Sequence, residues 1–287
     1  MPHPILILGG YGNFGKRIAQ RLVNDGLDVI IAGRNSSKAQ ALCTELSDTT
    51  KSLAFDVETG LDYALTQLRP KVVINTCGPF QSADYKIAET CIQHGVHYLD
   101  LADGRDFVTG ITSLDAQAKA QNVTVISGAS TVPGLSSAVL THYAQDFKQI
   151  NRLRFGISPG QKAERGLATT RGILSYVGRP LKPAYGQTKQ RYGWQNIYRQ
   201  AYPGLGKRWM ANCDIPDLDL LPKAFGIKDV QFSAGLELSA LHLGLYALSW
   251  CVRLGLPLPL EKWSGALLKA SNIFNRFGSQ DGGMHII

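Results

Sequence analysis

The chain has 287 residues, which is enough for two domains of ordinary size. Hydrophobic residues make up 44% of it and charged residues 18%, and this composition excludes a disordered protein. The formal net charge is +8, and the five cysteines are odd in number and lack C-x-x-C spacing, so we expect free thiols in a reducing, cytoplasmic compartment rather than disulfides or a zinc site.

A glycine loop follows directly on the first apolar run of the chain. Residues 5–8 read Ile-Leu-Ile-Leu and predict a short buried strand. The residues that follow satisfy the pattern G-x-G-x-x-G with Gly10, Gly12 and Gly15. The helix predicted next has three apolar residues on one face: Phe14, Ile18 and Leu22. Strand, glycine turn and helix in this order predict a dinucleotide-binding site with the pyrophosphate at the helix N-terminus.

The end of the second predicted strand, residues 28–33, indicates which dinucleotide binds. An NAD site places an acidic residue there to bind the ribose 2′-hydroxyl. Here Gly33 is followed by Arg34, Asn35 and Ser36, and no carboxylate is available. A guanidinium suits a 2′-phosphate, so the sequence predicts NADP(H) rather than NAD(H). The alternative is that Arg34 is an ordinary surface residue.

Strands and helices alternate through the first 130 residues. We expect further strands at residues 52–57, 72–77, 96–101 and 123–126, and helices at residues 39–46, from Ser82 as N-cap to His94, and at 112–121. This alternation predicts an α/β fold with a Rossmann-type, doubly wound parallel sheet. The predicted domains are an NADP-binding Rossmann domain at residues 1–130 and a basic domain for substrate binding and dimerisation at residues 131–287.

Cofactors bind beyond the carboxyl ends of the strands in such a sheet. The loops after the predicted strands therefore supply the candidate cofactor-binding residues, although each could also be an ordinary loop. The candidates are Gly10, Gly12, Asn13, Phe14, Gly15, Arg34, Asn35, Ser36, Asp56, Val57, Cys77, Gly78 and Pro79.

Three motifs carry a resemblance to a known family. They are Cys77-Gly78-Pro79-Phe80, the heptapeptide G-V-H-Y-L-D-L at residues 95–101, and G-A-S-T-V-P-G at residues 128–134. In this order the chain resembles the saccharopine dehydrogenase-like NADP-binding oxidoreductases over roughly residues 4–180. The resemblance implies a Rossmann domain, a second α+β domain that supplies the substrate pocket, and NADP(H)-linked redox chemistry. Relatives differ in substrate and include reductases of lipid-like molecules.

Two features depart from that family. Its members usually have a Tyr-Gly pair shortly after the Gly-Pro-Phe turn, where this chain has Ala-Asp-Tyr-Lys at residues 83–86. Residues 282–287 read as the opening of a strand, whereas similar proteins continue well beyond such a point. We therefore expect a second domain that is incomplete at its C-terminus.

The basic charge is concentrated in residues 151–213. Twelve lysines and arginines there face one acid, Glu164, which gives a local charge of +11. Four interpretations remain open: a funnel for an anionic substrate, docking on anionic lipid, nucleic-acid binding, or a solvated face without a partner. The lipid interpretation uses the interleaved aromatic residues Tyr185, Tyr192, Trp194, Tyr198, Tyr202 and Trp209. We favour a small-molecule substrate and a homo-oligomer, keep peripheral membrane contact as an alternative, and expect no nucleic-acid partner.

An uncharged run follows at residues 238–252. Its leucines and valine at helical spacing are Leu238, Leu241, Leu245, Leu248 and Val252. The run is shorter than the ~20 residues that a membrane-spanning helix needs. It predicts a buried core helix, with an interfacial helix as the alternative.

The sequence does not identify the catalytic residues. Asp103, Arg105 and Arg171 are candidates for substrate binding, because arginine pairs well with carboxylates, and surface ion pairs are the alternative. Cys77 has no local base and is interpreted as a small residue beside the nicotinamide rather than as a nucleophile. The six histidines lack metal-ligand spacing, so no metal site is predicted.

The sequence as a whole predicts an NADP(H)-dependent oxidoreductase that acts on an anionic small molecule. Two alternatives remain open. One is a non-catalytic NADP(H)-binding sensor or scaffold, and the other is a membrane-peripheral reductase of a lipid-like substrate.

Overall fold

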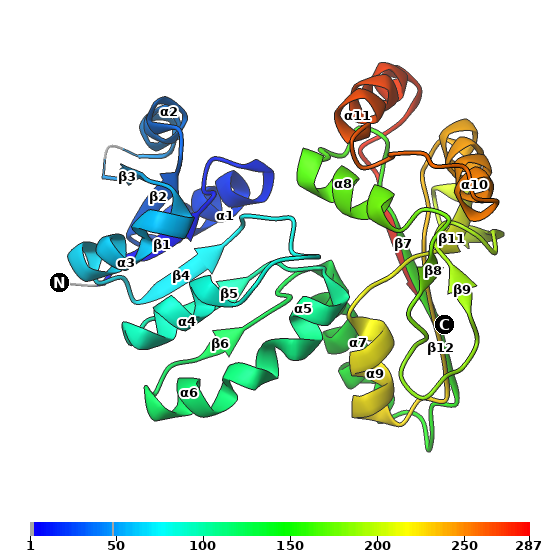
Figure 1. Ribbon diagram of the computed structural model, residues 1–287, viewed down its shortest axis with the longest axis horizontal. Coiled ribbons are helices and arrows are strands. Elements are labelled where there is room, and N and C mark those ends of the chain that lie inside the picture. Colours follow the sequence, from blue (N-terminus) through cyan, green and yellow to red (C-terminus); the bar gives the residue numbers. More distant parts are fainter. Residues whose placement is uncertain (1–2, 48) are drawn as a thin grey trace. The chain divides into compact units, whose positions relative to one another are not determined.

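The computed structural model describes residues 3–47 and 49–287. The chain divides into two compact units, Met1–Ser130 and Thr131–Ile287 (Figure 1). The first unit contains a six-stranded sheet in the order β3-β2-β1-β4-β5-β6. All of its strand pairs are parallel, as the sequence predicts. Its strands are β1 (Ile5–Leu8), β2 (Val29–Gly33), β3 (Lys51–Ala54), β4 (Val72–Asn75), β5 (His97–Asp100) and β6 (Val125–Ile126).

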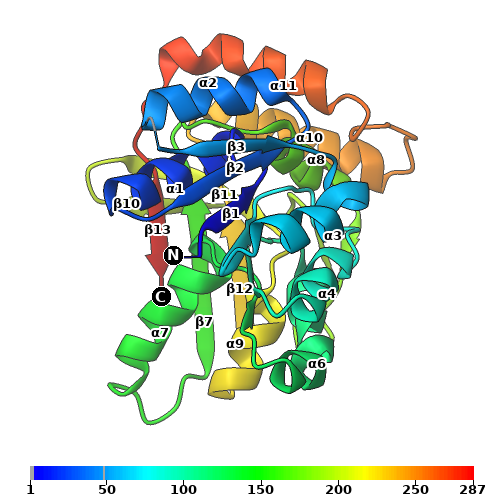
Figure 2. The same ribbon diagram turned by 90° about the vertical axis from the view of Figure 1, so that its left-hand side faces the viewer.

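Helices cover both faces of this sheet because its central strands are apolar on both sides. On β1, Leu6 and Leu8 point into one core layer and Ile7 points into the other. The layer around Ile7 is closed by α1 (Asn13–Asn24) and α2 (Ser36–Leu46). The opposite layer is closed by α3 (Val57–Leu68), α4 (Lys86–Gln93) and α6 (Asp115–Ala120) (Figures 1 and 2).

Several predicted elements need correction. The third strand ends at Ala54 rather than at residue 57, because the Asp56 side chain accepts a hydrogen bond from the Glu58 N–H at 3.0 Å and caps α3, a helix that the sequence analysis missed. Helix α5 (Arg105–Gly110), continued by the 3₁₀ turn η1 (Ile111–Leu114), was also missed.

Helix α4 starts later than predicted. Its first residue is Lys86 and its N-cap is Tyr85, so Ser82 does not cap it. The Tyr85 ring stacks on Phe107 with centroids 4.9 Å apart, and its hydroxyl donates to the Phe107 carbonyl at 2.7 Å. The Asp84 carboxylate also accepts from the Lys86 N–H at 3.2 Å, so a local contact and a tertiary contact together set the start of the helix.

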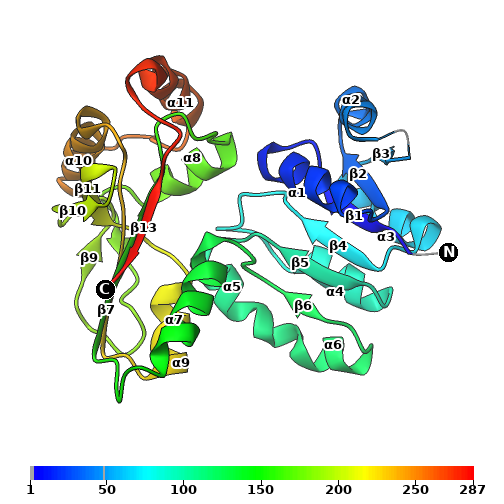
Figure 3. The ribbon, with the colours of Figure 1, turned by 180° about the vertical axis from the view of Figure 1, so that it is seen from behind.

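The second unit is built on a mixed five-stranded sheet in the order β10-β11-β12-β7-β13. Only β7 and β12 pair in parallel, and the other three pairs are antiparallel. The strands are β7 (Arg152–Ser158), β10 (Tyr198–Tyr202), β11 (Gly206–Asn212), β12 (Asp229–Ala234) and β13 (Gly283–Ile286), and a separate small ladder joins β8 (Pro180–Leu181) and β9 (Arg191–Tyr192). The strand expected at residues 282–287 is thus present as β13, beside β7 (Figure 3).

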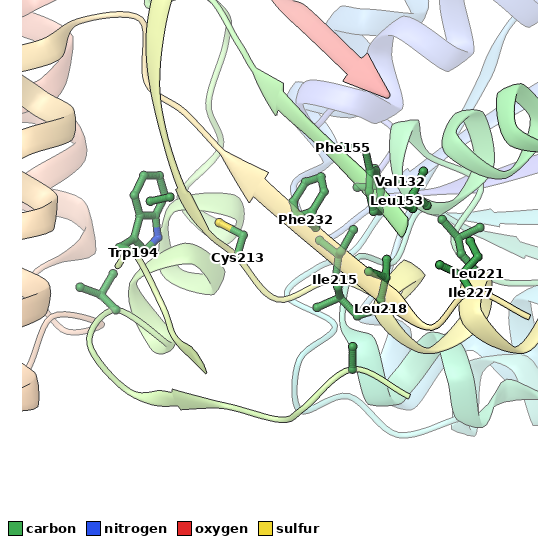
Figure 4. Close-up of a cluster of buried hydrophobic side chains, with 14 of the residues drawn as sticks. Val132, Leu153, Phe155, Trp194, Cys213, Ile215, Leu218, Leu221, Ile227 and Phe232 are labelled. Atoms are coloured by element: carbon green, nitrogen blue, oxygen red, sulfur yellow. The ribbon is translucent and has the colours of Figure 1, made fainter. Parts of the chain in front are cut away.

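Aromatic and aliphatic side chains of the central strands form the core of the second unit. Phe155 of β7 and Phe232 of β12 have ring centroids 5.1 Å apart (Figure 4). Helices cover this core, and the turn Thr131–Leu135 contributes Val132 to it. The helices are α7 (Ser136–Ala144), α8 (Leu167–Ser175), α9 (Asp217–Phe225), α10 (Ser239–Arg253) and α11 (Ser264–Ile273), the last continued by η3 (Phe274–Phe277).

The five-stranded sheet curls so that its two edge strands meet. The Tyr202 hydroxyl of β10 lies 2.8 Å from Nδ1 of His285 on β13. The buried Arg208 of β11 holds this arrangement by donating to the backbone carbonyls of Ser158 at 2.9 Å and Asp281 at 3.0 Å.

Helix α10 is less buried than the sequence predicts. His242 and Ser249 are buried on one face, whereas Leu243 and Trp250 are each 39% exposed. Leu245 and Val252 of the predicted apolar stripe pack on the core, so the expectation of a buried helix was wrong only for the face that carries Leu243 and Trp250. Among the described residues, no helix is long and apolar enough to cross a membrane.

A buried carboxyl group joins the first turn of α9 to α7. Oδ1 of Asp217 is hydrogen bonded to the Ser136 hydroxyl, and Oδ2 has no partner among the residues that the structure describes. Because Asp217 is fully buried, desolvation raises its pKa from the ordinary 3.8 to about 6, although the Ser136 bond opposes the rise.

The raised pKa of Asp217 predicts a pH-dependent effect of Asp217→Asn. The Asp217 carboxyl binds its proton more tightly in the folded state than in the unfolded state. Protonation of Asp217 therefore adds to the free energy of unfolding in full below the unfolded pKa, and this addition is lost as the pH rises through the folded pKa of about 6. We expect the variant to exceed the wild type in unfolding free energy by about 2–3 kcal/mol near pH 8 and by little near pH 4. Urea unfolding at both pH values measures this. A variant that is destabilised equally at both would contradict the assignment.

Candidate functional site

The loop after β1 is tight because its glycines leave room for close backbone contacts. Gly9 has φ +71°, and the Gly12 N–H donates to the Gly9 carbonyl at 2.8 Å. A Cβ on Gly15 would collide with the Gly9 carbonyl oxygen and would lie 2.7 Å from Cα of Gly10. A Cβ on Gly10 would lie 3.0 Å from Ile31 Cγ2. The loop therefore lies close to β1 and β2, as the glycine roles in a nucleotide fingerprint require.

The N-terminus of α1 is open toward this loop. Gly12 is its N-cap, and no side chain caps the helix. The N–H groups of the first turn thus offer hydrogen bonds and positive potential to an anion. Ile18 and Leu22 pack on the core as expected, but Phe14 is 49% exposed, so its predicted place on the buried face was wrong. Exposure leaves Phe14 at the loop, where it was also predicted to contact the cofactor.

The turn between β2 and α2 contains an exposed cation. Arg34 forms no ion pair with any described residue. Asn35 is the N-cap of α2, since its Oδ1 accepts from the Lys38 N–H at 2.9 Å, and Ser36 is the first helical residue. An unpaired guanidinium beside a helix N-terminus is well suited to a phosphate.

The parallel sheet brings the predicted cofactor-binding residues to one edge. The loops that follow β1, β2, β3 and β4 all lie at the carboxyl ends of adjacent strands. Burial raises the pKa of the Cys77 thiol to about 11. Two other candidate residues also affect this pKa: the Arg34 guanidinium lowers it, and the Asp56 carboxylate raises it. A thiol with this pKa is protonated at neutral pH, which argues against a nucleophilic role for Cys77.

The turn after β4 is held by polar groups that the sequence analysis did not single out. The Thr76 hydroxyl donates to the Leu8 carbonyl at 2.8 Å, and the Cys77 N–H donates to Oδ1 of Asn75 at 3.0 Å. The Asn75 amide in turn donates to the Tyr98 hydroxyl at 3.1 Å. The contacts hold Thr76 and Cys77, which directly precede Gly78, next to Gly9 of the glycine loop. The sequence did contain a signal for these contacts, since Asn75 is a polar residue in an otherwise apolar strand.

A buried carboxylate at the end of the next strand in the sheet also holds a loop by hydrogen bonds. Oδ1 of Asp100, at the end of β5, accepts hydrogen bonds of 2.9 Å from the N–H groups of Ala102 and Gly128 and from the Ser127 hydroxyl. Burial raises the pKa of Asp100, and these hydrogen bonds oppose the rise. Asp100 thereby ties the loop after β6 to the end of β5.

The comparison with protein families agrees with this geometry. Residues 5–126 match the model of the saccharopine dehydrogenase NADP binding domain. The match spans most of the first unit. This part of the chain is similar to an NADP-binding domain, and its glycine loop, open helix terminus and unpaired Arg34 fit that cofactor.

Two known proteins are similar to parts of the chain. Serine 3-dehydrogenase of Rhizobium radiobacter is 40% identical over 57 residues, which cover 20% of this chain and 23% of that protein. The structure of apo saccharopine dehydrogenase (L-Glu forming) from Saccharomyces cerevisiae aligns with a TM-score of 0.58 and 17% identity over 82% of this chain. At this identity the alignment shows a shared fold. The chain spans about half, 54%, of that protein's length.

The three predicted substrate-binding residues fall in different surroundings. Asp103 is exposed after β5 and accepts a hydrogen bond from the Gln81 amide at 3.1 Å. Arg105 is only 4% exposed in the first turn of α5. Arg171 is exposed on α8 in the second unit.

Part of the positive charge of the basic segment at residues 151–213 is neutralised by ion pairs. Five of its cations form ion pairs with carboxylates that come later in the chain. These cations are Arg152, Arg179, Lys182, Arg191 and Arg208. Two of its interleaved aromatic residues, Trp194 and Tyr202, are buried, so they are not available for a lipid surface.

The exposed position of Arg34 predicts a selective effect of Arg34→Ala. We expect the affinity for NADPH to fall about 10- to 100-fold, because the charge-assisted contact with the 2′-phosphate is lost. The affinity for NADH, which lacks that phosphate, stays nearly unchanged. Fluorescence titration with both nucleotides measures the effect. Arg21→Ala, which removes an exposed arginine paired with Asp25, is the matched control. Equal losses for both nucleotides would show that Arg34 does not bind the 2′-phosphate.

Proposed function

We propose that the protein is an NADP(H)-dependent oxidoreductase of saccharopine dehydrogenase-like type that acts on an anionic small molecule. The observation that carries the proposal is the nucleotide site of the first unit. There the glycine loop, the uncapped N-terminus of α1 and the unpaired Arg34 occur together in an NADP-binding domain of a dehydrogenase family.

The division of labour between cofactor and protein follows from this site. When bound, NADPH supplies a hydride, which together with one proton reduces a C=N or C=O bond and leaves NADP⁺. The glycines and the first turn of α1 hold the pyrophosphate, and Arg34 holds the 2′-phosphate. The hydrogen bonds of Asn75 and Thr76 orient the turn at Gly78, which we assign to the nicotinamide end of the site.

The charge of the second unit supports an anionic substrate. Among the described residues, several exposed cations of the segment at residues 151–213 have no carboxylate partner, and they would attract an anion. They are Arg154, Lys162, Arg171, Lys189 and Lys207. Arg171 is our candidate for a bidentate contact with a substrate carboxylate.

A panel of substrate pairs tests the proposed reaction. The purified protein is mixed with NADPH, an amino acid as the amine, and a 2-oxo acid as the carbonyl compound, and consumption of NADPH is followed by absorbance. We expect turnover with at least one pair and about tenfold lower kcat/KM with the methyl ester of the same 2-oxo acid, because the ester lacks the charge that the cations attract.

The controls separate the proposed reaction from its alternatives. Arg34→Ala should lower the rate at limiting NADPH, which confirms that turnover uses the proposed cofactor site. Tight NADPH binding without turnover on any pair would contradict the proposed reaction and favour a non-catalytic sensor or scaffold. Equal rates with acid and ester would remove the argument for an anionic substrate.

A second candidate function is that of a membrane-peripheral reductase, because apolar side chains are exposed from α10 to η3. Leu254 is 77% exposed, Ile273 68% and Phe277 62%. Cations lie between them in sequence, and Arg276 stacks on Phe277 at 4.6 Å. Apolar and aromatic side chains flanked by cations are typical of a contact with anionic lipid.

Sedimentation with vesicles tests this second candidate. We expect the protein to pellet with vesicles that contain phosphatidylglycerol, to pellet less with pure phosphatidylcholine, and to stay in solution when Leu254 and Ile273 are both changed to Asp. The matched control is Phe147→Asp, at an exposed apolar residue outside this segment. Failure of the wild type to pellet at low salt would contradict the candidate.

A further inference from the structure

One contact joins the two phosphate-binding parts of the nucleotide site. The ring of Tyr11, which lies between Gly10 and Gly12 in the sequence, packs directly on Gly33 at the end of β2. A Cβ on Gly33 would lie 2.5 Å from Cε1 of Tyr11 and 2.8 Å from its hydroxyl oxygen. Gly33 therefore leaves space for the Tyr11 ring.

A hydrogen bond completes the contact. The Tyr11 hydroxyl accepts from the backbone N–H of Asn35 at 2.9 Å. Asn35 is the N-cap of α2, and its own side chain accepts from the Lys38 N–H. Tyr11 thus holds both ends of the turn that carries Arg34: its ring covers Gly33, and its hydroxyl binds Asn35.

We propose that Tyr11 is a positioning residue that determines selectivity for NADP(H) over NAD(H). It fixes the turn from Gly33 to Asn35 so that the Arg34 guanidinium faces the 2′-phosphate. The inference rests on NADP(H) as the cofactor of the proposed function, and it adds a residue that the G-x-G-x-x-G pattern leaves unspecified.

Tyr11 affects selectivity because it limits the conformational freedom of the turn that carries Arg34. Arg34 has a long side chain and no ion pair among the described residues, so ordering it on binding costs conformational entropy. A turn that is fixed in advance lowers this cost. Without the Tyr11 hydroxyl, the Asn35 N–H loses its partner and the turn loosens. NADH makes no contact with Arg34 through a 2′-phosphate, so its binding depends less on the turn.

The experiment is a double-mutant cycle between Tyr11→Phe and Arg34→Ala, with dissociation constants for NADPH and NADH as readout. We expect Tyr11→Phe to weaken NADPH binding about 5- to 20-fold and NADH binding by less than about twofold. In the Arg34→Ala background, Tyr11→Phe should change NADPH binding by less than about twofold, because no guanidinium is left to position. Adenosine 2′,5′-bisphosphate should follow NADPH in every variant.

Two further variants and a stability measurement distinguish a loss of positioning from a loss of the fold. Tyr63→Phe removes the hydroxyl of an exposed tyrosine on α3 and should leave both affinities unchanged. Gly33→Ala adds a methyl group against the Tyr11 ring and should reduce the NADPH preference in the same way as Tyr11→Phe. Thermal unfolding of each variant shows whether the fold is retained.

The outcomes separate the inference from the proposed function. Equal weakening of NADPH and NADH by Tyr11→Phe, or an effect that persists in the Arg34→Ala background, would overturn the positioning role. A wild type that prefers NADPH while Tyr11→Phe keeps the same preference would overturn the inference alone. A wild type without any preference would overturn the proposed cofactor as well.

Discussion

The nucleotide site depends on the close approach of backbone to backbone at Gly15. A Cβ at this position would collide with the Gly9 carbonyl and crowd Cα of Gly10, so any other residue would push α1 away from β1. With glycine there, the first turn of α1 lies directly beyond the strand and opens toward the loop. Burial of Ile7 and Ala19 between the sheet and α1 then stabilises this arrangement. The fold and the phosphate site thus rest on the same contact.

Polar contacts also fix the other strand ends and loops at the carboxyl edge of the sheet. Thr76 bonds to the end of β1, Asn75 bonds to Tyr98 of β5, and Asp100 bonds to the loop after β6. Each bond joins residues that are far apart in sequence, and each is buried or partly buried, where an unmade bond is costly. The loops and strand ends at this edge of the sheet are therefore fixed relative to one another.

The sequence was sufficient to predict what depends on local pattern. Apolar runs located the strands of the parallel sheet, and the glycine spacing located the turn before α1. The start of α4 was misplaced, because Ser82 was taken as the N-cap, whereas Asp84 bonds to the Lys86 N–H and Tyr85 packs on Phe107. Nor could the partial exposure of α10, since leucine spacing does not tell which neighbours cover a helix. The contact between Tyr11 and Gly33 joins residues on two elements, so no single motif contains it.

The measurement that tests the account most directly is an equilibrium titration of the wild-type protein with NADPH and, in parallel, with NADH. The account predicts tight binding of NADPH and clearly weaker binding of NADH, because only NADPH carries the 2′-phosphate that the unpaired Arg34 is placed to bind. Equal affinity for the two nucleotides, or no binding of either, would contradict it.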